Sequence, residues 1–376
     1  MNRTSSRGWP RPRMRLLGRD WSSFQVCGTT GLLLGACLAM WLAGEQGLSR
    51  AVLCGLLAVA AVVFFTLAMV TKVITARESL VYYHHEVAIL ACCAVVLRTC
   101  GLPVLPYLDL TALGLGVFLA CGRQGCLMVG CCHGRPHGFG VAYSEAHADE
   151  GFPRRYVGVP LFPVQALESF LVLAIVCGGA ALVLRGHPPG AALTWCVATY
   201  STLRIWLEEL RGDALRAYWC RLSEAQWTSL VILSGITWGE WQGRLPMSPW
   251  HTAMLVFAGL SMAWLAFGRS PVRALVQAGH AGEIADIMRE APSSALRVDV
   301  RRTSLEIRLS TQKLDGSHAF LVSLSRADRL LTMGEARALA RLIAQLVFVG
   351  ANRRRELLDS GRGVFHLILR SEQGRG

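Results

Sequence analysis

Charged side chains are scarce in this chain, and lysine is almost absent. Asp, Glu, Lys and Arg make up 17% of the 376 residues, whereas about 25% is usual in a soluble domain. Hydrophobic residues make up 53%, and the mean hydropathy is +0.40. This composition excludes an ordinary soluble globular protein and predicts a membrane protein.

The positive charge is carried by arginine. The net charge is +13 at pH 7, and Lys72 and Lys313 are the only lysines. Arginine suits phosphate contacts, but the same excess is typical of loops that face anionic lipid. We interpret Arg353, Arg354 and Arg355 as a solvated helix end, because no aromatic residues accompany them as in nucleic-acid sites. We therefore expect no nucleic-acid partner.

A cleavable signal peptide and a disulfide framework are also missing. The basic first residues lead into an apolar run of spanning length without a clear small-residue cleavage site, so we expect this run to stay in the protein. Most of the 13 cysteines, such as Cys37, Cys54 and Cys177, lie inside apolar runs. Cysteine behaves there as a small hydrophobic residue.

Apolar runs that approach the length of a membrane span, about 20 residues, recur through the first 270 positions. They predict about seven or eight transmembrane helices, because several runs are short or interrupted by glycine. A miscount is expected at the two shortest, 107–121 and 227–241. The runs cover 24–43, 51–70, 86–105, 107–121, 164–184, 191–207, 227–241 and 250–267.

The composition becomes charged and mixed after about Pro271. A helix is expected over 332–349, opened by the capping box Thr332-Met333-Gly334-Glu335. Around it, segments with alternating polarity predict four strands. These strands are expected at 296–300, 304–310, 319–325 and 364–370.

The expected fold is an all-α polytopic membrane protein followed by a small soluble α+β domain. We place a basic tail at 1–23, the membrane domain at 24–269 and a soluble domain of unknown function at 270–376. A unit of roughly a hundred residues is large enough for its own core. We find no catalytic motif in it.

The stretch GRQGCLMVGCCHGRP, residues 122–136, interrupts the apolar pattern with glycine, arginine, cysteine and histidine. Glycines at intervals of three to five residues allow sharp turns and close backbone approach. Arg123 lies among them at a helix end, beside a segment that needs a cavity or a protein cover at membrane depth. A pocket for a phospholipid head group fits these properties.

Charged residues in apolar runs are functional candidates. Arg204, Glu208 and Arg211 follow at i, i+4 and i+7, so they share one helix face. Two guanidinium groups held by a carboxylate can grip a phosphate. The spacing fits an interfacial salt-bridge ladder equally well.

Three rival interpretations of these residues are disfavoured. A metal site from Cys126, Cys131, Cys132, His133 and His137 is disfavoured, because the spacing lacks the paired Cys-x2-Cys of structural zinc sites. A redox pair of adjacent cysteines is disfavoured by disulfide strain, and a transporter by the lack of an inverted repeat. We expect no metal and no cofactor.

The motifs together resemble the prolipoprotein diacylglyceryl transferase family, in the variant whose signature contains cysteines. Besides the signature, the similarity is carried by Leu108-Asp109-Leu110, by Phe162-Pro163-Val164-Gln165-Ala166-Leu167-Glu168 and by the segment from Leu203 to Asp213. It covers about 24–241. The last apolar run and the soluble domain are additions to it.

The resemblance implies transfer of a diacylglyceryl group from phosphatidylglycerol to the lipobox cysteine of a bacterial prolipoprotein. The partners are then phosphatidylglycerol, the signal peptide with its lipobox cysteine, and membrane lipid. It implies a multi-pass protein of the bacterial cytoplasmic (inner) membrane. Arg123 and Arg204 would stabilise the departing phosphate, and His84 would be the base.

The remaining site residues expected from the motifs bind substrate. They are Gly122, Gly125, Cys126, Cys131, Gly134, Gln165, Glu168, Glu208 and Arg211.

The chain departs from the family pattern at several positions. His85 and Glu86 replace two glycines after His84, and Cys131 stands where the familiar signature has glutamate. Two alternatives therefore stay open, a diverged paralogue that acts on another acceptor and a Cys/His metal-binding membrane protein. The orientation is also open, because the family's site faces outward whereas the arginine-rich start predicts a cytoplasmic amino terminus.

Overall fold

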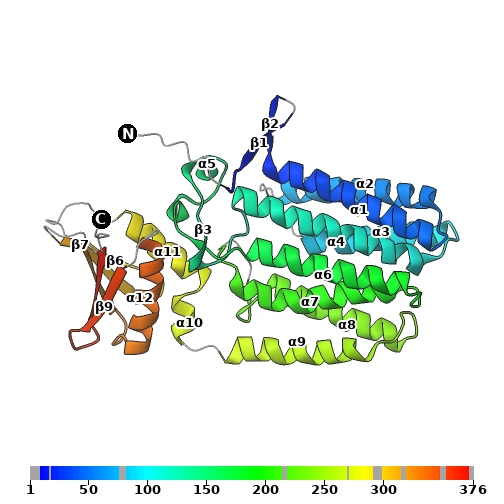
Figure 1. Ribbon diagram of the computed structural model, residues 1–376. Helices are drawn as coiled ribbons and strands as arrows, with labels where there is room; N and C mark the ends of the chain where they lie inside the picture. Colours follow the sequence, from blue (N-terminus) through cyan, green and yellow to red (C-terminus); the bar gives the residue numbers. More distant parts are fainter. Residues whose placement is uncertain are drawn as a thin grey trace.

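The computed structural model describes residues 9–16, 18–75, 82–213, 218–268, 271–290, 299–314, 319–347 and 353–371. Within them, helices of 18 to 26 residues lie side by side and form an elongated helical body (Figure 1). They are α1 (Ser23–Glu45), α2 (Arg50–Thr75), α3 (Tyr82–Thr99), α4 (Val104–Val129), α6 (Val164–Leu184), α7 (Ala191–Leu210), α8 (Glu224–Trp241) and α9 (Pro249–Phe267).

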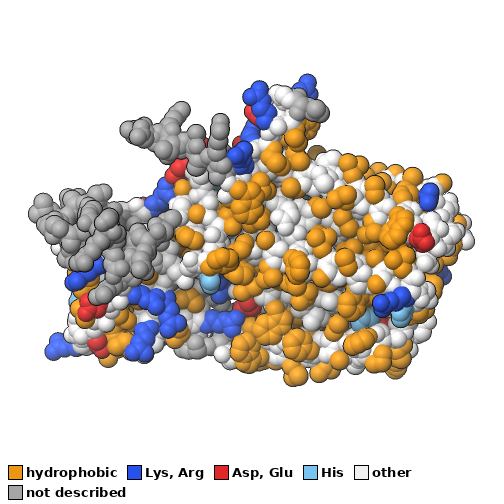
Figure 2. Space-filling view, in the orientation of Figure 1, with side chains coloured by type: hydrophobic (Ala, Val, Ile, Leu, Met, Phe, Trp, Pro, Cys, Tyr) orange, Lys and Arg blue, Asp and Glu red, His pale blue; other side chains and the backbone are white. Residues whose placement is uncertain are grey.

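The surface of the helical body is apolar. Phe65, Ile74 and Phe267 are 67%, 76% and 87% exposed, and Figure 2 shows hydrophobic side chains over most of this part of the molecule. Large apolar surfaces of this kind are not left in water. Five helices, α1, α2, α4, α6 and α9, are long and apolar enough to cross a bilayer. The chain is therefore a multi-pass membrane protein.

The apolar runs predicted the helices, with errors at their ends. The short run at 107–121 is the middle of α4, which continues through the signature to Val129 and qualifies as a span. The run at 227–241 lies in α8, which has 18 residues and is not among the five candidate spans. The basic tail expected at 1–23 instead contains a hairpin of β1 (Arg13–Leu16) and β2 (Arg19–Ser22).

Small residues let α1 and α4 pack closely. A Cβ atom added to Gly35 would lie 2.5 Å from the carbonyl oxygen of Gly114, so the two backbones are nearly in contact. A Cβ on Gly125 would similarly lie 3.1 Å from Cα of Phe24. Close backbone approach through small residues is a general way to join helices in lipid, where apolar burial between helices adds little. Gly125 of the signature therefore allows α4 to pack directly against α1.

The C-terminal part contains an antiparallel sheet in the order β6-β7-β8-β10-β9. Its strands are β6 (Val300–Arg302), β7 (Ile307–Leu314), β8 (Ala319–Arg326), β9 (Arg353–Asp359) and β10 (Phe365–Ser371). Alternate residues such as Leu309, Val322 and Leu367 are fully buried and belong to one core with Leu339 and Ile343 of α12 (Met333–Val347). This is the period-two burial of a sheet covered on one face.

The sequence located three of these strands and the helix, and it missed β9. Arg353, Arg354 and Arg355 were interpreted as a helix end, which is wrong, because they begin β9 and pair with β10. Their charges hide a strand in which few residues are apolar. Most of the strand expected at 296–300 lies outside the described residues, and β6 begins at Val300.

The C-terminal sheet domain is joined to the helical body. α10 (Pro271–Leu275), α11 (Ala278–Arg289) and α12 lie between the sheet and the body (Figure 1). The segment after the signature shares a hydrophobic core with them, to which Phe152 and Tyr156 contribute beside Ile284. An ion pair of 3.0 Å between Arg155 and Asp286 lies at the same junction. The sheet domain therefore rests on the loops that follow the signature.

Glu335 is the main polar group at the start of α12. The capping box expected there is confirmed, since the Thr332 amide donates to Oε2 of Glu335 at 3.0 Å and the Glu335 amide to Oγ1 of Thr332 at 3.4 Å. Arg326 also donates to Oε1 of Glu335 at 3.2 Å. Burial raises the pKa of Glu335, but hydrogen bonds from Arg329 and Thr332 outweigh this and bring the pKa to about 2.

We predict that Glu335→Gln destabilises the sheet domain by about 2 kcal/mol, because a cap and charge-assisted hydrogen bonds are lost. The lowered pKa means that Glu335 stabilises the fold above about pH 4.5, and that this contribution is lost as the pH falls toward 2. Hydrogen exchange of α12 in the full chain measures the effect. Glu356→Gln, at an exposed position of β9, is the control. Equal exchange in both variants would contradict the prediction.

Candidate functional site

Three of the four predicted motifs, namely the signature and the segments 162–168 and 203–213, meet at one end of the helical body. α4 and α7 end there and α6 and α8 begin there, next to the loops that carry the sheet domain (Figure 1). Most of the polar side chains expected to bind substrate are buried at this end, including Arg123, Gln165, Glu168, Arg204 and Glu208. Burial of so many charges is costly unless they are paired.

Arg123 and Glu168 form the central ion pair. Nε of Arg123 lies 3.0 Å from Oε2 of Glu168, with side-chain exposures of 10% and 1%. The hydroxyl of Tyr200 donates to Oε1 of the same carboxylate at 2.6 Å. Three helices, α4, α6 and α7, are thereby joined through a single carboxylate.

Two further arginines extend this group along α7. Nη2 of Arg204 lies 3.0 Å from Oε2 of Glu208, and Arg211 forms a two-point contact with Asp213 at 3.0 and 3.1 Å. The charges of Arg204 and Arg211 also act on Glu168. All three side chains of the i, i+4, i+7 set are buried at the end of α7, where Arg204 and Glu208 form an i,i+4 ion pair.

The signature loop is fixed by backbone contacts. α4 ends at Gly130, whose φ of 84° reverses the chain, and a Cβ there would lie 2.7 Å from Phe152. Nε2 of Gln165 then donates to the carbonyl oxygen of Cys131 at 2.8 Å. Cys132 has a φ of 53°, a left-handed conformation that is uncommon outside glycine and often marks functional sites.

Gly134 has no room for a side chain. A Cβ there would lie 2.2 Å from the carbonyl oxygen of Phe162. The residue is bridged to Arg211, and the amide of Gly212 donates to the carbonyl of His133 at 2.9 Å. By contrast, a Cβ on Gly122 meets no atom within 4 Å. Close packing therefore explains why glycine stands at 125 and at 134, but not why it stands at 122.

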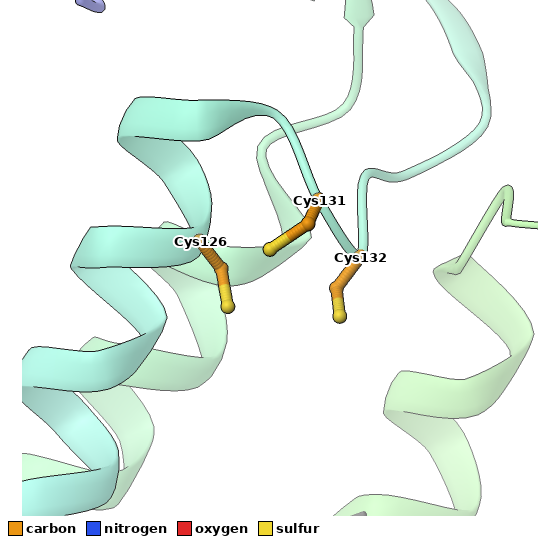
Figure 3. A group of neighbouring side chains, drawn as sticks. All are labelled: Cys126, Cys131 and Cys132. Atoms are coloured by element: carbon orange, nitrogen blue, oxygen red, sulfur yellow. The ribbon is translucent and has the colours of Figure 1, made fainter. Parts of the chain in front are cut away.

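The three signature cysteines lie together. The Sγ atoms of Cys126, Cys131 and Cys132 are all within 4.8 Å of one another (Figure 3). Hydrogen bonds with Cys126 and Cys131 and the charges of Arg211 and Arg123 hold the pKa of the Cys132 thiol well below its usual value, against the effect of burial. His133 and His137 bond instead to the carbonyls of Gly134 and Phe139, both at 2.9 Å.

His84 lies at the same end of the body but apart from this network. It is half-exposed, and its Nε2 lies 3.2 Å from Oε1 of Glu224, the first residue of α8. Tyr83 points inward instead, since its hydroxyl lies 3.0 Å from Oγ of Ser229 and its ring lies 5.6 Å from that of Tyr200. The ionic contacts recorded among the described residues do not join His84 to Arg123 or Arg204.

Asp109, which belongs to the motif Leu108-Asp109-Leu110, has a structural role at the other end of the body. Its carboxylate accepts hydrogen bonds from the amides of Gly190 and Leu193, both at 2.7 Å. These are amides at the start of α7, so Asp109 satisfies groups that a helix leaves unpaired there.

Sequence reasoning missed Tyr200 and Arg273. Tyr200 precedes Arg204 by four residues, so extending the same helix face by one turn finds it. Arg273 of α10 pairs with Glu209, which also accepts from Nε2 of Gln226 at 3.1 Å. No spacing rule links Arg273 to α7, because the contact depends on how the sheet domain docks.

The fold and the site define a multi-pass membrane protein with a buried arginine and carboxylate network at one end of its helical body. Residues 20–239 match the family model described as prolipoprotein diacylglyceryl transferase. The chain therefore belongs to the prolipoprotein diacylglyceryl transferase family, as its motifs suggested.

Curated relatives agree with this assignment. A phosphatidylglycerol–prolipoprotein diacylglyceryl transferase 2 from Clostridium perfringens is 34% identical over 137 residues, which is 35% of this chain and 50% of the relative. A phosphatidylglycerol–prolipoprotein diacylglyceryl transferase from Dehalococcoides mccartyi is 26% identical over 127 residues, which is 34% of this chain and 47% of the relative. The chain thus spans about half the length of the curated relatives it matches.

The packing of the loop predicts different outcomes for two signature glycines. Gly134→Ala should loosen the loop, because the clash is with backbone, whereas Gly122→Ala should be tolerated. The measurement is maleimide labelling of Cys131 and Cys132, read by peptide mass spectrometry. We expect labelling to be at least about tenfold faster in Gly134→Ala, because local opening exposes the thiols. Equal labelling in the two variants would show that the close packing of Gly134 has no effect.

Proposed function

We propose that this chain transfers a diacylglyceryl group from phosphatidylglycerol to the thiol of a lipobox cysteine. Family membership and the names of the relatives support the reaction class. Arg123 and Arg204, each held by a carboxylate, support a substrate that carries a phosphate.

One observation carries the proposal. Two buried polar atoms, Nη1 of Arg204 and Oε1 of Gln165, have no hydrogen-bond partner among the described residues. Buried polar atoms are nearly always paired in a complete structure, so such groups need an explanation. A phosphodiester oxygen and a head-group hydroxyl are partners of the right chemistry for a guanidinium N–H and an amide oxygen.

The charge change of the reaction explains the arginines. Phosphatidylglycerol carries one negative charge, and the glycerol phosphate that leaves carries two. Positive groups placed at this position stabilise the charge that develops in the transition state more than the charge of the bound lipid. We assign this role to Arg123 and Arg204. Glu168 and Glu208 hold the two guanidinium groups in place.

We propose His84 as the base, the role that the resemblance to the family implies. Its pairing with Glu224 orients the imidazole at the membrane face. Cys126, Cys131, Gly125, Gly134 and Arg211 are proposed to shape the head-group pocket, since they belong to the loop and to the helix ends around it. Gly122 remains a proposed substrate contact.

We propose that α3, α7 and α8 cross the membrane together with the five candidate spans, which gives eight spans in residues 24–269. α1 then begins and α9 ends at the same membrane face (Figure 1). The membrane is proposed to be the cytoplasmic membrane of a bacterium. We place the site and the sheet domain of residues 270–376 on its outer face, where lipobox cysteines emerge.

Replacement of either arginine tests the proposed reaction. Arg123→Ala and Arg204→Ala should each lower diacylglyceryl transfer at least about a hundredfold, the loss that follows removal of one donor to a developing charge. Arg98→Ala, in the last turn of α3 at the other end of the body, is the matched control. Activity is read by rescue of a bacterium depleted of its own transferase.

The result against the proposal is equally clear. If the unaltered chain is folded and inserted but does not rescue growth, the acceptor is not a lipobox cysteine. If rescue occurs and both arginine variants rescue as well as Arg98→Ala, the assigned phosphate role is wrong.

The proposed topology is tested by fusing a reporter after Gly376. Alkaline phosphatase, which folds only outside the cytoplasm, should be active there, and green fluorescent protein should be dark. The arginine-rich amino terminus argues for the opposite orientation. A dark phosphatase fusion together with a fluorescent green fluorescent protein fusion would reverse the proposed orientation.

A further inference from the structure

The three signature cysteines lie close enough together to hold one metal ion. Zinc binds thiolates at about 2.3 Å, so two sulfur ligands of a tetrahedral site lie about 3.8 Å apart. The Sγ atoms of Cys126, Cys131 and Cys132 are within 4.8 Å of one another. Figure 3 shows Cys126 on the last turn of α4 and the other two on the loop that folds back beside it. The sulfurs are thus at most about 1 Å farther apart than two thiolates on one zinc ion.

We propose that this cluster binds Zn²⁺ through three thiolates and offers the fourth position to the thiol of the acceptor cysteine. The inference rests on the proposed transferase function and specifies how that site activates its protein substrate. Among the described residues, no fourth His, Cys, Asp or Glu donor joins the group. Three protein ligands with one open position is the arrangement of catalytic rather than structural zinc.

The proposed reaction needs an activated thiol, because the thiolate is the nucleophile. A thiol that coordinates zinc is deprotonated. The thiol proton passes through water at the exposed edge formed by Cys131 to His84, the proposed base at the same end of the body. The coordinated thiolate then attacks the glyceryl carbon, the carbon–sulfur bond forms, and the carbon–oxygen bond to phosphate breaks. The electron pair of that bond leaves with glycerol phosphate, so the negative charges of thiolate and lipid end on that product.

The cluster is close to the phosphate-binding arginines. Cys126 follows Arg123 by three residues on α4, so the two share a helix face. Gln165 donates to the carbonyl of Cys131 and precedes Glu168, the partner of Arg123, by one helical turn. A thiolate on the metal is thereby placed next to the group that must leave.

The loop holds the cysteines in place without a metal. Cys132 keeps its left-handed conformation because the loop is tied to α6 through Gln165 and to α7 through Gly212. Such preorganisation suits a site that must bind its ion in one geometry.

The test begins with the purified full-length chain and its metal content. We expect about one zinc per chain, retained in Cys121→Ser and lost in Cys126→Ser and Cys132→Ser. Cys121 is a matched control, because it lies on the same helix outside the cluster. Replacement of zinc by Co²⁺ should give a thiolate-to-cobalt charge-transfer band. This band should change when a lipobox peptide is added, but not when its cysteine is replaced by serine.

Activity provides the second measurement. Removal of metal with a chelator should lower transfer at least about a hundredfold, and added Zn²⁺ should restore it. This comparison uses the unaltered chain, so it does not depend on how well the cysteine variants fold. A metal-free chain that transfers at the full rate would overturn the zinc site and leave the transferase proposal standing. A zinc-loaded chain with no activity toward any lipobox peptide would instead overturn the transferase proposal.

Discussion

Charges buried in a membrane protein must be neutralised, and this requirement organises the site end of the molecule. Glu168 of α6 contacts Arg123 of α4 and Tyr200 of α7, so one carboxylate joins three helices. The positive charges of Arg204 and Arg211 also act on this carboxylate. Removing either partner of such a pair leaves an uncompensated charge, which costs several kcal/mol. The network is therefore a constraint on the packing of the helices as well as a binding site.

The loop after α4 depends on that constraint. Gln165, in the first turn of α6 close to Glu168, donates a hydrogen bond to the loop. Gly212, which follows Arg211 after the end of α7, donates a second one. The segment beyond it then packs under the sheet domain, which also reaches α7 through Arg273. The sheet domain and the site are thus joined through packed residues. The extra domain is physically part of the face at which we place the chemistry.

Much of the fold could be predicted from the sequence, because hydrophobic runs in a membrane protein are long and little else competes with them. The limits of the helices could not, since α4 continues through the polar signature to Val129. Strand β9 was missed because most of its residues are charged. Its arginines contribute no apolar alternation, and its place is fixed by pairing with β10.

The grouping of the expected site residues could be predicted where they share a helix, but not where they come together from different elements. Arg204, Glu208 and Arg211 followed from spacing on α7, but the closeness of Cys126 to Cys131 and Cys132 depends on the turn at Gly130 and on the left-handed Cys132. No pairing rule for cysteine spacing describes that loop. His84 was expected among the arginines and instead lies beside Glu224.

The central claim is that this buried network carries out diacylglyceryl transfer. The most direct measurement uses the purified chain, phosphatidylglycerol and a lipobox peptide, with the peptide product read by mass spectrometry. The account predicts a peptide that gains one diacylglyceryl group as a thioether on its cysteine, together with one released glycerol phosphate per transfer. An unmodified peptide, with a folded chain and intact lipid, would contradict it.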